Sequence, residues 1–315
     1  MTGVVSGLLA AWGLDLVLGD PQSWPHPVRA MGKAAAWLET ALTGALGRDR
    51  LSGILFTLIL VGGTWLAAWA LLAGAMALHP WLGWGLSVYL LTTCFATRDL
   101  ADHALRVFRA LKVGDLPLAR SHLAHLVGRD TENLEEKEIV RGTVESVAES
   151  SVDGVLSPIV FAALGGAPLA LAFKMASTLD SMVGHKNEKY LQFGWASARL
   201  DDALNWIPAR LSRWIYPLAA KILGLRARDS WAIAWRDGHK SPSPNAAISE
   251  AAMAGALGVQ LGGLNHYQGQ SEERALLGEP LRELEADDIL KAIQLMVMVS
   301  AWGLVLGLLP HFFAP

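Results

Sequence analysis

The stretch from Lys174 to Arg213 gathers carboxylate, amide and basic side chains between two segments that are apolar enough to enter a bilayer. Ionisable groups beside hydrocarbon are energetically costly, and they usually mark a functional site. The stretch therefore predicts such a site. Its candidate members are Lys174, Asp180, Lys186, Asn187, Arg199, Asp201, Asp202, Asn205 and Arg210.

Within this stretch, Asp201, Asp202 and Asn205 form a DDxxN pattern. The pattern loosely resembles the aspartate-rich motifs with which enzymes hold a metal ion against a diphosphate, although so short a pattern is not specific by itself. Its surroundings strengthen the interpretation, because Lys and Arg side chains can neutralise phosphate oxygens around the same ion. We expect Asp201 and Asp202 to bind Mg²⁺ and the nearby cations to contact phosphate.

A second group of carboxylates lies upstream. Glu145, Glu149 and Asp153 recur every four residues, so on a helix they line one stripe. Like charges at this spacing repel each other. Three stacked carboxylates are explained most simply as ligands for a hard cation such as Mg²⁺, which binds oxygen and often bridges to phosphate. A merely acidic, solvent-exposed helix face remains the alternative.

Two proline-containing segments supply the remaining candidates. Residues 20–29 hold three closely spaced prolines, which predict an ordered loop rather than a helix and present Asp20, His26 and Arg29. The alternative is a polar loop that merely leaves the membrane. The turn at 241–245 presents Asn245 before a helix of small residues, whose backbone N–H groups could receive an anion.

The composition predicts the class of protein. Apolar residues make up 52% of the 315 residues and charged residues only 17%, and no charged residue occurs between Arg50 and Arg98. That interval is long enough for two membrane spans of about 20 residues each. With a net charge of −3 there is no basic field to attract nucleic acid. The single cysteine, Cys94, excludes an intramolecular disulfide and a cysteine-based metal cluster.

These observations predict an all-α, polytopic integral membrane protein with four to five membrane segments and additional cytoplasmic amphipathic helices. The expected segments are 3–18, 52–78, 82–97, 154–173 and 290–309, the first being a retained span rather than a signal peptide. The Gly165–Pro168 break divides the fourth segment into pieces too short to cross, which favours a broken or re-entrant helix pair. In the second segment, Gly62, Gly63 and Gly74 are interpreted as sites of close helix packing.

The polar segments are assigned to the cytoplasm, because Lys and Arg concentrate in them. They comprise 19–50, 98–150, 174–205 and 225–288 of one membrane-embedded domain, 1–315. Helical periodicity broken at Gly114 and Pro117 predicts two amphipathic helices. Gly262 and Gly263 predict a tight bend between elements, and the acidic residues 270–288 are interpreted as solvated, with little functional signal.

Four blocks of the sequence resemble one known family. They are LDLVLGDPQSWPHPVRAMG (14–32), ESVAESSVDGVLSP (145–158), ALGGAPLALAFKMASTLDSMVGHKNEKYLQFGWASARLDDALNWIPARL (163–211) and SPNAAISEAAMAGALGVQLGG (243–263). In order, and over nearly the whole chain, they are similar to the CobD/CbiB proteins of cobalamin biosynthesis, the adenosylcobinamide-phosphate synthases.

The resemblance implies a multi-pass enzyme of the cell inner membrane whose active site faces the cytoplasm. It implies an ATP-dependent ligase that joins adenosylcobyric acid, the corrinoid substrate, to (R)-1-amino-2-propanol or its O-phosphate. An unactivated carboxylate does not condense with an amine in water, so we expect an acyl phosphate intermediate. That route requires carboxylates for Mg²⁺, cations for phosphate and a base for the ammonium group.

The candidate residues are assigned to these roles as hypotheses. The catalytic candidates are Glu145, Glu149, Asp153, Asp180, Asp201 and Asp202, of which Glu149, Asp153, Asp201 and Asp202 are the candidate Mg²⁺ ligands. The candidate substrate and phosphate contacts are Asp20, His26, Arg29, Lys174, Lys186, Asn187, Arg199, Asn205, Arg210 and Asn245. For each of them an internal salt bridge, such as Asp180 with Lys174, is the structural alternative.

Other functions remain open at this point. One is an intramembrane Mg²⁺-dependent transferase acting on a diphosphate substrate. Another is a transporter, which would also place charge among broken helices, and a third is a structural subunit that assists a neighbouring enzyme. Membrane lipid is an expected partner, and both a homo-oligomer and contact with other membrane enzymes of the corrinoid pathway are open.

Overall fold

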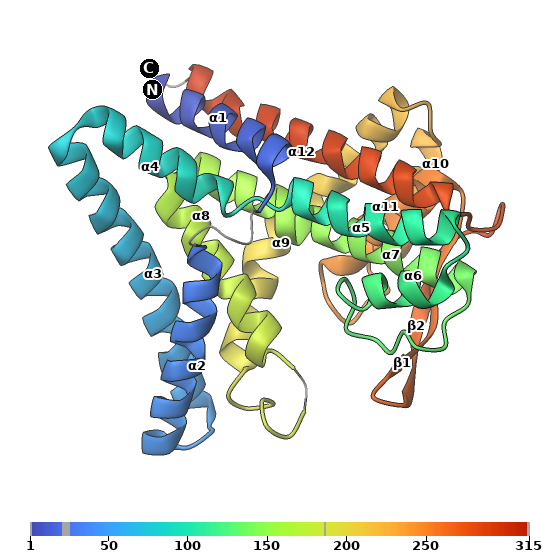
Figure 1. Ribbon diagram of the computed structural model, residues 1–315, viewed down its shortest axis with the longest axis horizontal. Helices are drawn as coiled ribbons and strands as arrows, with labels where there is room; N and C mark the ends of the chain where they lie inside the picture. Colours follow the sequence, from blue (N-terminus) through green and yellow to red (C-terminus); the bar gives the residue numbers. More distant parts are fainter. Residues whose placement is uncertain (1, 21–25, 186, 314–315) are drawn as a thin grey trace. The chain divides into compact units, whose positions relative to one another are not determined.

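The computed structural model describes residues 2–20, 26–185 and 187–313, most of which are helical (Figure 1). The chain forms two compact units. The first unit comprises Met1–Ala96, Ser157–Asn205 and Leu304–Pro315, and the second comprises Thr97–Leu156 and Trp206–Gly303.

The first unit is built around helix α8, Ser157–Val183. Four earlier helices pack against it: α1 (Thr2–Leu18), α2 (Pro27–Leu46), α3 (Arg50–Leu78) and α4 (Pro80–Thr92). The beginning of α9 (Trp195–Ile222) and the end of α12 (Asp287–Phe313) complete the unit. The close association of α2 with α3 can be followed in Figure 1.

The prediction of an ordered, non-helical loop over residues 20–29 is wrong from Pro27 onward. Helix α2 begins at Pro27, because proline is tolerated in the first turn, where its missing N–H group has no intrahelical partner. His26 caps this helix, since its Nδ1 accepts a hydrogen bond from the Val28 backbone N–H at 3.3 Å. The prolines at 21 and 25 lie outside the described residues.

The predicted break in the fourth apolar segment is confirmed. Gly165 (φ −146°) and Gly166 (φ 65°) are non-helical, and Pro168 follows directly. The positive φ at Gly166 is accessible to glycine at little steric cost. The helix axis is therefore interrupted inside α8, while the re-entrant path itself stays a prediction.

By length and composition, three helices could cross a membrane: Arg50–Leu78, Asp287–Phe312, and Glu136–Val183, a continuous helical run that ends with α8. Helices α1 and α4 contain 17 and 13 residues, which is fewer than the roughly 20 that a full crossing requires. The prediction of a membrane protein is supported by three helices rather than by all the expected segments.

The second unit is helical with one exception. Its helices are α5 (Thr97–Lys112), α6 (Leu116–Leu123), α7 (Glu136–Ser150), the π-helix η1 (Ser151–Leu156), the remainder of α9, α10 (Ala227–Asp237), α11 (Ala246–Leu257) and the first part of α12. The two predicted amphipathic helices are confirmed as α5 and α6, which are separated by Gly114 (φ 75°) and the capping residue Asp115.

The exception is an antiparallel hairpin of β1 (Gln260–Tyr267) and β2 (Gln270–Gly278), which corrects the all-α prediction. Gly262 and Gly263 do not form a bend between elements. They lie inside β1, where the pairing register shifts, and both have positive φ. The chain turns instead at Gln268 and Gly269. Helix α11, buried along its whole length, packs against both strands and against α7 and α10.

The packing interpretation of the glycines in α3 is also wrong. A Cβ atom at Gly62, Gly63 or Gly74 would meet no atom within 4 Å, whereas one at Gly53 would overlap the carbonyl oxygen of Phe193. Close packing at that end of α3 continues in the Phe56–Phe193 ring contact, with centroids 4.9 Å apart. The glycine that permits close approach is therefore Gly53.

We predict that Gly53→Ala destabilises the protein and that Gly62→Ala, in the same helix, does not. The added methyl at Gly53 must displace backbone, an overpacking effect that typically costs about 1–3 kcal/mol. At Gly62 the exchange should be neutral or stabilising by up to about 1 kcal/mol, because alanine is the better helix former. Thermal unfolding of both variants in detergent measures the difference, and equal melting temperatures would contradict this account of α3 packing.

Candidate functional site

The predicted carboxylate stripe lies in the second unit. Glu145 and Glu149 are on α7, but Asp153 is in the π-helix η1. Because a π-helix bonds residue i to i+5, Asp153 does not continue the four-residue repeat of an α-helix. Asp153 therefore does not lie in line with Glu145 and Glu149 on the helix surface, although all three residues belong to one continuous helical segment.

Glu145 makes the contacts of a structural carboxylate. Arg129 Nη1 donates to its Oε2 at 2.9 Å, and the Gly262 backbone N–H donates to its Oε1 at 2.8 Å. The side chains of Arg129 and Glu145 are 3% and 6% exposed. Both oxygens of Glu145 are thus engaged inside the protein, which corresponds to the salt-bridge alternative for this residue.

The same interaction fixes the irregular part of β1. Arg129 also donates to Asn265 Oδ1, which accepts a second bond from Arg141 Nη2 at 3.0 Å. Arg141 further donates to the carbonyl oxygens of Gly262 and of Leu264. Arg141 thereby satisfies two carbonyl groups in the irregular part of β1, and Arg129 holds the Asn265 side chain beside them.

Glu250 is a third carboxylate close to this cluster. It lies on α11 and is 5% exposed, and its nearest cation is Arg274 of β2, whose Nη1 is 4.0 Å from Oε1. Burial raises the pKa of Glu250 well above its ordinary value, and the negative charges of Glu149 and Glu145 raise it further. A buried carboxylate in this environment is held in a costly state when it is ionised.

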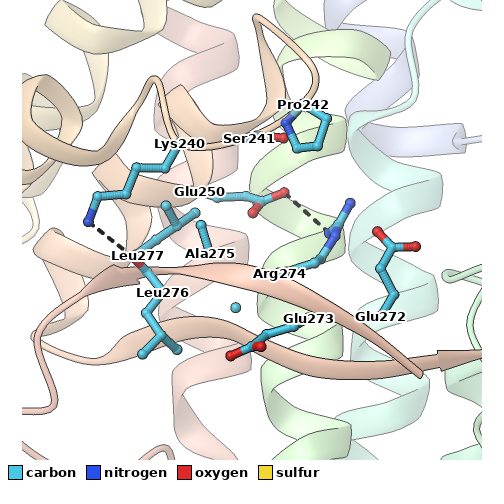
Figure 2. Close-up of a pocket in the computed structure, with 11 residues that line it drawn as sticks. Lys240, Ser241, Pro242, Glu250, Glu272, Glu273, Arg274, Ala275, Leu276 and Leu277 are labelled. Carbon is cyan, nitrogen blue, oxygen red and sulfur yellow. Dashed lines mark hydrogen bonds and ion pairs between the residues drawn. The ribbon is translucent and has the colours of Figure 1, made fainter.

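Glu250 faces a cavity of about 430 Å³ (Figure 2). The lining residues are Lys240, Ser241, Pro242, Glu250, Gly262, Glu272, Glu273, Arg274, Ala275, Leu276 and Leu277. Its walls are thus the hairpin, α11 and the turn that precedes α11, and they present charges of both signs.

Buried Asp237, at the end of α10, holds two of these walls in place. It accepts hydrogen bonds from Arg236 and from the backbone N–H of Gly278, and it pairs with Lys240 at 2.7 Å. Although burial acts to raise it, the hydrogen bonds from Arg236 and Lys240 hold the pKa of Asp237 well below its usual range. Asp237 therefore ties the end of β2 to Lys240 at the edge of the cavity.

Two predicted residues of the second unit meet although they are far apart in sequence. Arg210 Nη1 donates to Asn245 Oδ1 at 3.0 Å, and the Arg210 guanidinium lies over the Trp206 ring at 4.2 Å. Asn245 is the N-cap residue of α11, but its side chain does not make the capping hydrogen bond. The Asn245 side chain is oriented by Arg210 rather than by its own helix.

The first unit contains the other predicted group. Asn205 Nδ2 donates to Asp201 Oδ2 at 3.0 Å, and Asn205 Oδ1 accepts from Ser157 Oγ at 2.6 Å. Asp202 lies near Asp180, so that their charges interact. Arg199 approaches Asp202 at 3.9 Å. Asp201 and Asn205 therefore share one helical face, with Asn205 fixing the Asp201 carboxylate.

The salt bridge considered as the structural alternative for Asp180 is wrong. The charged groups that act on Asp180 are Asp202 and His185, rather than Lys174. Lys174 lies instead near Cys94. Asn187 stabilises a turn by accepting the Tyr190 N–H at 3.0 Å. Lys186 lies outside the described residues.

The predicted N-terminal candidates are associated with the start of α2. Asp20 Oδ1 is 3.3 Å from His26 Nε2 while the other ring nitrogen of His26 caps the helix. Arg29 is exposed in the first turn of α2. Asp20 and His26 are thus brought together, in a contact that orients a helix cap.

Within residues 2–20, 26–185 and 187–313, no group of three or more His, Cys, Asp or Glu side chains is arranged to hold a metal ion. Mg²⁺ is commonly bound through one or two carboxylates together with substrate phosphates. The neighbouring Asp180 and Asp202 carboxylates are a donor set of that smaller kind.

Comparison with known proteins identifies the family. A family model described as CobD/Cbib protein matches residues 8–296. The chain belongs to the CobD/CbiB family. It is 50% identical over 296 residues to the cobalamin biosynthesis protein CobD of Geobacter metallireducens, a match that covers 94% of this chain and 93% of the relative. It is 44% identical over 299 residues to the cobalamin biosynthesis protein CbiB of Salmonella typhimurium, covering 94% of each. No solved structure matches the chain.

Sequence reasoning about this CobD/CbiB chain missed Glu250 and Arg274. A signal for Glu250 was present, because it is the one charged residue between Asn245 and Gly258 in an otherwise small and apolar segment. Arg274 offered no comparable signal, since it follows several polar residues in a segment that was interpreted as solvated. Arg129 and Asn265 were missed because the partner that makes each of them important is distant in sequence.

We predict that Arg129→Met unfolds or strongly destabilises the protein, because Glu145 would keep a buried charge without its cation. Breaking a buried pair in this way typically costs about 3–5 kcal/mol. The double variant Arg129→Met/Glu145→Met should recover much of that loss. Lys137→Met is the matched control, because Lys137 lies on α7, as Glu145 does, and pairs with Glu283 at an exposed position. It should cost no more than about 1 kcal/mol. Thermal unfolding checks the series, and an unrecovered double variant would contradict the pairing.

We predict that Glu250→Gln raises thermal stability at pH 8. A carboxyl whose pKa is higher in the folded state stabilises the fold while it is protonated, below its unfolded pKa, and loses that contribution as the pH rises through the folded value. The melting-temperature advantage of Glu250→Gln should therefore grow from pH 5 to pH 8. Exposed Glu132→Gln is the control and should show no such trend. An advantage independent of pH would show that burial does not disfavour the Glu250 charge.

Proposed function

We propose that this protein forms the amide bond between adenosylcobyric acid and (R)-1-amino-2-propanol or its O-phosphate, producing adenosylcobinamide or adenosylcobinamide phosphate. The observation that carries this proposal is the match to CobD/CbiB proteins over 94% of the chain. That match includes the segments that hold Glu149, Asp201, Asp202 and Glu250. A cytoplasm-facing site in the inner membrane is part of the proposal, supported by the three long apolar helices and by the basic residues of the polar segments.

The proposed chemistry has two steps. The γ-phosphoryl group of ATP passes to the corrinoid carboxylate, which forms an acyl phosphate and releases ADP. The amine nitrogen, after losing a proton to a base, then attacks the acyl carbon and expels inorganic phosphate. Bound Mg²⁺ would neutralise charge on the phosphate oxygens during such a transfer.

The residues are proposed for these steps from their chemistry and surroundings. Asp201 and Asp202, with neighbouring Asp180, are proposed as carboxylates for Mg²⁺, and Arg199 as a contact for phosphate. In the second unit, Glu149 and Asp153 keep their proposed role as carboxylates for a metal or a base. Glu145 is a poorer candidate for a catalytic role, because both of its oxygens already accept hydrogen bonds.

A second function is supported by one contact. Asn205 fixes the Asp201 carboxylate, and an oriented aspartate beside a second one would also suit a Mg²⁺-dependent transferase that acts on a diphosphate. The two functions differ in their products, because a diphosphate transferase releases pyrophosphate or a phosphomonoester and forms no amide.

We predict that purified protein, supplied with adenosylcobyric acid, aminopropanol phosphate, ATP and Mg²⁺, forms the amide product. Asp201→Asn and Glu149→Gln should each lower turnover at least about 100-fold, the usual scale for losing a group that acts in proton transfer or charge stabilisation. Product and nucleotide are measured by chromatography, and size-exclusion profiles verify folding. Glu132→Gln again serves as the exposed control.

Two outcomes would overturn parts of this proposal. Folded wild-type protein that forms no amide and hydrolyses no nucleotide would remove the ligase function. Amide formation at the wild-type rate in both variants would keep the ligase function and remove the assigned roles of the two carboxylates.

A further inference from the structure

The Glu250–Arg274 pair is unusual because both side chains lack ordinary hydrogen bonds. Their closest atoms are 4.0 Å apart, which is beyond hydrogen-bond range. Among the described residues, neither side chain makes a hydrogen bond to another side chain or to backbone. Figure 2 shows the two groups directed toward each other from α11 and β2 at the cavity of about 430 Å³.

Burying a carboxylate in this state is expensive. An ionised group that leaves water needs hydrogen bonds as well as an opposite charge. The cations that favour the Glu250 charge, Arg274 and then Arg129, make no hydrogen bond to it, and Glu149 and Glu145 oppose its charge. Nearby Glu145 shows the contrast, since both of its oxygens accept hydrogen bonds. The Glu250 carboxylate is therefore placed to accept hydrogen bonds from something that enters the cavity.

Arg274 presents the complementary requirement. A guanidinium group carries five N–H donors in a fork that matches the oxygens of a phosphate or carboxylate. Two further donors lie on the same cavity wall. Lys240 is held there by Asp237, and the Ser241 hydroxyl oxygen accepts the Ser243 N–H, which leaves its own O–H able to donate.

One small molecule that carries both an ammonium and an oxyanion would satisfy both groups. An ammonium has three N–H donors and a positive charge for Glu250, and a phosphate has the oxygens that Arg274 requires. The cavity volume lies within the range of small-molecule sites. The chemical class that fits is a short amino alcohol phosphate.

We propose that this cavity binds the amine substrate of the proposed ligase as a zwitterion, with its ammonium group on Glu250 and its phosphate on Arg274. The identity of the ligand rests on the proposed function, whereas the pairing of charges rests on the cavity. The phosphorylated amine is then preferred to free 1-amino-2-propanol, because only the former engages Arg274.

The test is a direct titration of the purified full-length protein in detergent, without ATP or corrinoid. The probes are 1-amino-2-propanol O-phosphate, 1-amino-2-propanol, which lacks the phosphate, and isopropyl phosphate, which lacks the ammonium group. Isothermal titration calorimetry should show the zwitterion binding at least tenfold more tightly than either half.

Substitutions at Glu250 and Arg274 should show which part of the ligand each residue recognises. Glu250→Gln should lose the preference for the zwitterion over isopropyl phosphate while retaining affinity for isopropyl phosphate. Arg274→Gln should lose affinity for isopropyl phosphate while retaining weak binding of 1-amino-2-propanol, and Arg274→Lys, which keeps the charge without the fork, should be intermediate. Glu132→Gln and Arg228→Gln, at exposed positions, are the matched controls and should bind all three probes as the wild type does.

The outcomes separate the two proposals. Equal affinity of the wild type for the zwitterion and its halves, or folded Glu250 and Arg274 variants that bind all probes normally, would overturn the assignment of this cavity. Amide formation with an unchanged KM for the amine in those variants would overturn it too, while the proposed ligase function would stand. Selective binding by a protein that forms no amide would support the cavity and remove the ligase function.

Discussion

The second unit depends on the buried ion pair between Arg129 and Glu145. Arg129 precedes α7, Glu145 lies in its middle, and the groups they reach, Gly262 and Asn265, belong to β1. The pair therefore joins the helix to a strand more than a hundred residues later in the chain. Because a buried charge is tolerated only with its partners in place, the bulged strand and the helix must form together.

Close packing of α11 makes the neighbouring cavity possible. A Cβ atom at Gly255 would overlap the Asp229 carbonyl, and Ser230 Oγ donates to the Ala252 carbonyl at 2.9 Å, so α10 and α11 approach each other at backbone distance. Small side chains on α11 permit this approach and leave Glu250 as the long polar group on the helix. Its carboxylate consequently extends to the hairpin, where Arg274 lies, rather than to solvent.

Features that depend on local sequence could be predicted, and features that depend on distant partners could not. The break between α5 and α6 and the interruption at Gly165 and Gly166 follow from glycine and proline chemistry at those positions, and both were found. The hairpin was missed because β1 contains a glycine pair and β2 begins with exposed polar residues, so neither shows the alternation that indicates a strand. The Asp180–Lys174 salt bridge, considered as the structural alternative, rested on proximity in sequence, whereas Asp180 interacts with Asp202 of the next helix.

The carboxylates of the second unit show how structure distinguishes residues that the sequence presents as equivalent. Glu145 and Glu149 lie four residues apart on the same helix. In the sequence, Glu250 appears only as an isolated acidic residue in an apolar segment. Hydrogen bonding separates two of them: Glu145 is saturated by Arg129 and Gly262, and Glu250 is buried beside a cation that it does not reach. A saturated buried carboxylate stabilises the fold, while one that is desolvated but not saturated costs stability, which protonation or a bound ligand can offset. Such a cost is compatible with a functional role, and it points to the cavity beside Glu250 rather than to the more conspicuous acidic stripe.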